Sequence, residues 1–214
     1  MNQYINEVLK ERVGLEKLYA FKVKDNLVSR VTGKQINGLF CYSTKEILLD
    51  SSLGDSPRKC VAIYLHEVGH LLALEYCMDT SPNADAHNPY FAVLVVTMYR
   101  RANLLEYLKL YDFCDTSAGQ RAYHLDEMPE DEELIARFEY IVRRSASLAN
   151  SDLSMEQLAT KLYFEDYRQH IVSGIFPTPS KSTTKTSWLK ICIYFFALTG
   201  FAAVSGAIAA SIFP

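Results

Sequence analysis

The stretch VAIYLHEVGHLLALEYC, residues 61–77, decides the fold of this chain. Ser56 and Pro57 stand shortly before it, and a small polar residue followed by proline is typical of the first turn of a helix. His66 and His70 are four residues apart, so on a helix both imidazoles project from the same face. The apolar residues that fall on the opposite face are Val61, Tyr64, Leu65, Val68, Leu71 and Leu72. We therefore expect a helix from Pro57 to about Cys77 that is half core and half functional site.

The pattern HExxH in this helix predicts a zinc site. His66 and His70 have the separation that two ligands of a tetrahedral zinc ion need. Glu67 lies about 100° around the helix axis, where it can act as a general base toward a water molecule on the metal. Small residues on a third strip of the helix would let a neighbouring segment come close: Ala62, Gly69 and Ala73.

A third ligand is needed, because a catalytic zinc ion usually has three protein ligands and one open position. His87 is our first choice, since it follows a polar stretch that allows the chain to fold back. An acidic third ligand is the alternative, and Asp85 could act as that ligand or as a partner of a ligating imidazole. A purely structural role for the HEVGH helix also remains open.

The phrase His87-Asn88-Pro89-Tyr90-Phe91, placed after a HExxH helix, resembles the SprT-like zinc metalloproteases, which include proteases of DNA–protein crosslinks. The match covers roughly residues 36 to 105, with Asn88 where that family typically has glycine. The resemblance implies a compact α+β zincin domain with Zn²⁺ held by His66, His70 and His87 and with Glu67 as the base. It does not carry over the link to DNA, because the chain has no cysteine zinc ribbon and is mildly acidic.

ImmA/IrrE-like metallopeptidases are a second family with a similar HExGH helix. The resemblance to that family would imply an acidic third ligand from a helix further downstream. Residues 92 to 103 contain no carboxylate here, and Glu106 comes late in the chain.

Around this helix the sequence predicts further helices and a small sheet. Two β-type runs with a break at Ser43-Thr44-Lys45 favour a small three-stranded antiparallel sheet, in which residues 39–42 are the strand best placed to pair with an extended substrate. The predicted strands cover 27–31 and 39–49, and the other predicted helices cover 3–19, 90–113, the residues after Pro129, and 155–172. His124, Tyr90 and Tyr99 are candidates for stabilising an oxyanion, whereas His170 is expected to be an inert surface residue.

Composition limits the classes of function. The chain has 214 residues, 49% of them hydrophobic, and a net charge of −3, which provides no basic surface for nucleic acid. The cysteines are odd in number and include no CxxC pair, which is typical of reduced thiols in the cytosol: Cys41, Cys60, Cys77, Cys114 and Cys192. The first residues lack the apolar run of a signal peptide.

The end of the chain predicts a membrane anchor. We expect a metallopeptidase domain over 1–172, a flexible linker over 173–187 and a transmembrane helix over 188–214, where the last 24 residues are uncharged. Lysines before the span place the domain on the cytoplasmic side, and small residues within it permit a homodimer. These residues are Lys181, Lys185 and Lys190, and Gly200, Ala203, Gly206 and Ala210.

The sequence thus favours a zinc-dependent peptidase that acts on a protein or peptide at the cytoplasmic face of a membrane. Two alternatives remain. One is a catalytically silent, zinc-stabilised binding protein with the same anchor, and the other is a protease of nucleic-acid-associated proteins.

Overall fold

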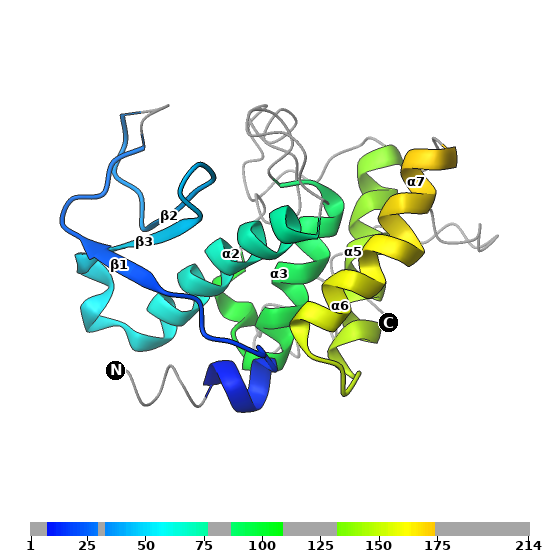
Figure 1. Cartoon of the computed structure of the whole chain (residues 1–214), viewed down its shortest axis with the longest axis horizontal. Coiled ribbons are helices and arrows are strands. Elements are labelled where there is room, and N and C mark those ends of the chain that lie inside the picture. Colours follow the sequence, from blue (N-terminus) through cyan, green and yellow to red (C-terminus); the bar gives the residue numbers. More distant parts are fainter. Residues whose placement is uncertain (1–7, 30–32, 77–86, 109–131, 174–214) are drawn as a thin grey trace, which may run out of the picture.

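A computed structural model describes residues 8–29, 33–76, 87–108 and 132–173. The architecture is α+β, as expected, with a small sheet beside the long helix α2 and the remaining helices on the other side of α2 (Figure 1). Helix α2 (Pro57–Glu75) packs against the sheet through β2 and against α3 (Pro89–Ala102), which in turn packs against α5 (Glu132–Ala149). The helix with the HEVGH pattern therefore lies between the sheet and the helical layer.

The sheet is mixed and not antiparallel. Its strands are β1 (Phe21–Lys24), β2 (Gly38–Cys41) and β3 (Glu46–Asp50), in the order β1-β3-β2. Strand β2 is antiparallel to β3, but β1 is parallel to it. The predicted strand 27–31 was wrong in its described part, which forms only one bridge between Val28 and Gln35. The parallel strand β1 takes the place beside β3, and β2 is an edge strand among the described strands, as predicted.

Helix α2 confirms the amphipathic pattern of the sequence. It follows the short 3₁₀ turn η2 (Ser51–Asp55), begins at Pro57 and ends at Glu75. The residues 77–86 that come after Tyr76 lie outside the described part of the chain. All six residues predicted to face the core are buried. The hydroxyl of Tyr64 on this core face bonds the backbone of Tyr19, and burial raises the pKa of Tyr64 to about 12.

Helix α3 begins and ends at asparagines. The side-chain oxygen of Asn88 accepts hydrogen bonds from the backbone N–H groups of Tyr90 and Phe91, both at 3.0 Å, and Pro89 occupies the first turn. Asn103 adopts a left-handed conformation (φ 55°) and ends the helix. The prediction of one helix over 90–113 was therefore wrong from Asn103 to Leu108, where the 3₁₀ turn η3 (Leu105–Tyr107) follows instead.

The terminal elements partly follow the predictions. Helix α6 (Met155–Leu162) opens with a reciprocal capping box between Ser154 and Gln157, as predicted, and continues through the π-helical turn η5 (Tyr163–Tyr167) into α7 (Arg168–Ser173). At the other end, the helix predicted over 3–19 is described only as the turn η1 (Val8–Val13), which ends because Gly14 adopts φ 75°.

Arg101, at the end of α3, joins three parts of the fold. Its half-buried guanidinium donates hydrogen bonds to backbone carbonyls of five residues: Val13, Leu148, Ala149, Ser151 and Leu153. These carbonyls come from η1, from the end of α5 and from the loop before α6. One side chain thus joins η1 and the connection between α5 and α6 to the end of α3.

Within the described ranges, no helix has the length and apolarity needed to cross a membrane. The linker predicted over 173–187 and the transmembrane helix predicted over 188–214 lie outside the described residues, apart from Ser173.

Candidate metal centre

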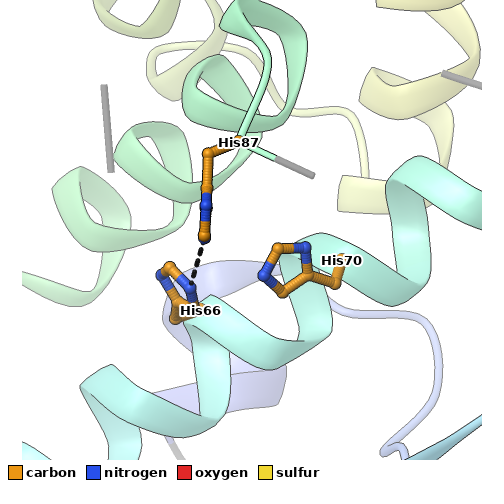
Figure 2. Close-up of side chains that lie close together, drawn as sticks. All are labelled: His66, His70 and His87. Carbon is orange, nitrogen blue, oxygen red and sulfur yellow. Dashed lines mark hydrogen bonds between the residues drawn. The ribbon is translucent and has the colours of Figure 1, made fainter. Parts of the chain in front are cut away.

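Three histidines from two elements point toward one another (Figure 2). His66 and His70 come from consecutive turns of α2, and His87 stands just before the N-cap of α3. One nitrogen of each ring lies within 4.8 Å of the others. His66 and His70 are only 7% and 6% exposed, so the cluster is held in the interior and not on a mobile surface.

Two of the donor atoms have the spacing of ligands of a tetrahedral metal ion. Nε2 of His66 and Nε2 of His87 face each other at 3.2 Å. Two nitrogen ligands of a tetrahedral zinc ion at its usual bond length are separated by roughly 3.3 Å. Three imidazoles are a ligand set that suits Zn²⁺ and also other first-row divalent ions. The structure therefore brings together the three predicted ligands in an arrangement that can hold a metal ion.

Phe91 packs against all three imidazoles. Its ring stacks on His70 with the centroids 4.2 Å apart, and it meets His66 and His87 edge-on at 5.2 and 5.0 Å. Phe91 is fully buried in the first turn of α3, where the Asn88 cap fixes the start of the helix. The cap and the ring together place His87 over α2, which gives Asn88 a clear structural role at the position where the SprT-like pattern has glycine.

Gly69, within HEVGH, allows α3 to approach α2 this closely. A Cβ atom at Gly69 would lie 2.6 Å from Cγ2 of Val95 and 3.1 Å from Cε2 of Phe91, which is closer than van der Waals contact allows. Nearby, the hydroxyl of Tyr99 donates a hydrogen bond of 2.9 Å to the carbonyl of Ala62. The strip of small residues on α2 is thus where the neighbouring helix packs, as predicted.

Glu67 lies on the other side of the cluster, against the edge strand. It is 6% exposed, and a Cβ atom at Gly38 of β2 would lie 2.7 Å from its Oε1. The same Cβ would lie 2.6 Å from Cγ2 of Ile63. The absence of a side chain at Gly38 therefore gives the carboxylate of Glu67 the space that it occupies beside β2.

The same face of β2 reaches His70. Phe40 lies parallel to the His70 ring at 6.4 Å between centroids, and the hydroxyl of Tyr42, the first residue after β2, lies 3.2 Å from Nδ1 of His70. Gly38, Phe40 and Tyr42 alternate along the strand, so all three face α2. Sequence reasoning missed these contacts. The alternation of the strand was a signal for a shared face, but nothing in it indicated that this face meets the metal ligands.

The other predicted participants are bonded elsewhere or lie outside the described residues. Tyr90 is buried and bonds Nδ1 of His170 at 2.8 Å, and Tyr99 bonds α2 away from the cluster. His170 is half-buried in this contact, so its prediction as an inert surface residue was wrong about its position.

Glu106 forms an ion pair with Arg58. Asp85 and His124 lie outside the described residues. Among the residues that are described, the groups of His, Cys, Asp and Glu able to hold a metal comprise this histidine triad alone.

Comparisons of the chain with protein-family models, with curated proteins and with solved structures found no match.

Proposed function

We propose that this chain is a zinc-dependent peptidase of the kind that its SprT-like motif suggests. In this proposal His66, His70 and His87 hold the ion and Glu67 is the general base. The observation that carries the proposal is one buried carboxylate that lies beside an edge strand of the described sheet and comes from the same helix as two of the three clustered histidines. A metal site, a base and a strand for substrate binding then adjoin one another, which is what peptide hydrolysis requires.

Zinc, when bound, supplies Lewis-acid chemistry that polarises a peptide carbonyl and makes water more acidic. The chain supplies the proton transfers. Glu67 takes a proton from the attacking water and delivers it to the leaving amine, a role for which its position one residue from His66 is suitable. Burial of Glu67 excludes bulk water and strengthens its electrostatic action on charges that develop nearby.

Strand β2 is the proposed binding edge for the substrate. An extended peptide can pair with the backbone of an edge strand, and β2 has its hydrogen-bonded neighbour β3 on one side only. Gly38 lies beside Glu67, and Tyr42, after the other end of the strand, lies beside His70. A peptide paired along β2 would therefore pass the base and the metal ligands in turn.

The proposed location is the cytoplasmic face of a membrane. The support for it is the uncharged C-terminal sequence and the lysines that precede it. A membrane anchor would confine the peptidase to membrane-proximal proteins, and a dimer through the small residues of the anchor is part of the same proposal.

The test compares Glu67→Gln with Glu75→Gln, a matched substitution at the end of the same helix. We expect the full chain, purified in mild detergent, to hold about one zinc per molecule in all three forms, as measured by elemental analysis. Cleavage of an unfolded protein should fall by about 10²- to 10⁴-fold in Glu67→Gln only.

Three results would overturn the proposal in different ways. Full cleavage by Glu67→Gln would remove the assigned base. Zinc binding without hydrolysis of any substrate, together with unfolding on chelation, would indicate a silent binding protein. Retention of single-stranded DNA by the chain at physiological salt would instead favour a protease of nucleic-acid-associated proteins.

A further inference from the structure

The contact between Tyr42 and His70 differs from the other contacts around the histidines. Phe91 stacks on the His70 ring at an interplanar angle of 19°, and Phe40 lies parallel to this ring at 10° with the centroids 6.4 Å apart. Tyr42 meets the ring edge-on and places its hydroxyl 3.2 Å from Nδ1. Tyr42 is half-buried at the start of the turn between β2 and β3, so its backbone is fixed by the strand before it.

Apolar stacking leaves one property of a histidine ring undecided. A half-turn of the ring about its bond to Cβ exchanges Nδ1 with a carbon atom and Nε2 with another carbon, while the stacked surfaces stay almost the same. Phe91 and Phe40 therefore fix the plane of the His70 ring but not which edge carries the nitrogens. A hydrogen bond to Nδ1 does decide this, because only one of the two ring orientations can form it.

The contact also suits the tautomer of a metal ligand, because a hydroxyl can accept a hydrogen bond from Nδ1–H as well as donate one to Nδ1. In Figure 2 the nitrogen of His70 farther from the backbone points toward His66 and His87, whereas Nδ1 is the atom bonded to Tyr42. When Nε2 gives its lone pair to a metal ion, the ring proton is on Nδ1, which then donates to the hydroxyl oxygen of Tyr42. The oxygen of Tyr42 accepts this bond without itself touching the metal.

We propose that Tyr42 is a positioning residue that holds the His70 ring in the orientation of a metal ligand, with Nε2 toward the other two histidines. This inference rests on the proposed metal function of the three histidines. It assigns a role in the site to the turn after β2, because the hydroxyl that orients His70 comes from the same strand that leaves space for Glu67.

The experiment measures zinc affinity of the full chain by competition with a chromophoric chelator, for the wild type, Tyr42→Phe and Tyr64→Phe. Tyr64 is the matched control, since its buried hydroxyl lies on the opposite face of α2 and bonds the backbone of Tyr19. We expect Tyr42→Phe to bind zinc about 10- to 100-fold more weakly, which is the usual effect of losing such a partner. Tyr64→Phe should bind as the wild type does.

Each outcome separates this inference from the proposed function. Equal zinc affinities in the wild type and Tyr42→Phe would overturn the role of Tyr42 and leave the metal site intact. Equal losses in both variants would mean a general effect on the fold and would also overturn it. Failure of the wild type to bind zinc would overturn the proposed function itself.

Discussion

The two sides of the metal centre are built in different ways. On one side, the helical wall consists of Phe91 and Val95 of α3. On the other, the strand wall consists of Gly38, Phe40 and Tyr42 on and just after β2. The helical wall packs on α2 through apolar atoms, with Gly69 as the point of closest approach. The strand wall meets the polar groups of the site, with Gly38 beside the Glu67 carboxylate and Tyr42 at His70.

This difference indicates that the two walls have different roles in the metal centre. Apolar packing is strong but does not discriminate between orientations of a ring, so the helical wall holds the three imidazoles together. A hydrogen bond to a hydroxyl is weaker than apolar packing but directional, and a space of fixed size admits only a group that fits it. The strand wall therefore determines the orientation of individual side chains. Damage to the helical wall should therefore cost stability, whereas damage to the strand wall should cost function.

The largest effect is expected from Phe91→Ala. Removal of a fully buried ring should lower the free energy of unfolding by about 3–5 kcal/mol, because it leaves a cavity at the point where all three imidazoles meet α3. Urea denaturation of the metal-free protein measures this loss. Phe164→Ala, at a ring that is 53% exposed, is the control and should be nearly neutral. A loss of similar size in both variants would contradict the assigned role of the helical wall.

Gly38→Ala should affect catalysis more than stability. The added methyl group must displace the Glu67 carboxylate or Ile63, and a base displaced by about 1 Å can cost about 100-fold in rate. We expect kcat for peptide cleavage to fall by that order while zinc affinity stays unchanged. Gly54→Ala is the matched control, since a Cβ atom there would meet nothing within 4 Å. Unchanged kcat in Gly38→Ala would show that the strand wall does not position the base.

The smallest effect is a difference in acid sensitivity between the walls. Asp50, at the end of β3, accepts hydrogen bonds from the backbone N–H groups of Leu27 and Ser52, and bonds from the Ser52 side chain and these amides hold its pKa below the ordinary value. Because the pKa is lower in the folded state, this stabilisation is present above the unfolded pKa. It is lost as the pH falls through the folded pKa.

Hydrogen exchange of the metal-free protein can detect this loss. On acidification, the amides of β2 and β3 should lose protection before those of α3, and Asp50→Asn should abolish the difference in pH dependence. Simultaneous loss of protection in both walls would contradict the comparison.

The sequence predicted the helical wall better than the strand wall. The bounds of α2 were predicted from Pro57 and from the helical period of its apolar residues. The place of His87 beside the other two histidines was predicted from a motif. These are local signals, in which residues a few positions apart determine the structure. Only the C-terminal end of α3 was predicted wrongly. Asn103 ends the helix in a left-handed conformation, and the apolar residues around it gave no sign of this end in the sequence.

The strand wall depends on pairings between distant residues. Strand β1 alternates apolar and basic residues over only four positions, which is too short a pattern to predict a strand, and its parallel pairing with β3 has no local signal. The roles of Gly38 and Tyr42 depend on where β2 crosses α2. That crossing follows from the packing of the whole sheet, and a single sequence does not reveal it.

The bonds of Arg101 determine which fragments of the chain can fold. One guanidinium in α3 binds carbonyls on both sides of the metal centre in the sequence, at Val13 and at Leu153. A fragment that begins after Val13 or stops before Leu153 would retain the three histidines but leave this half-buried cation with fewer acceptors, which should lower its stability. We therefore expect the shortest folded unit around the metal centre to extend well beyond the residues that resemble a known motif.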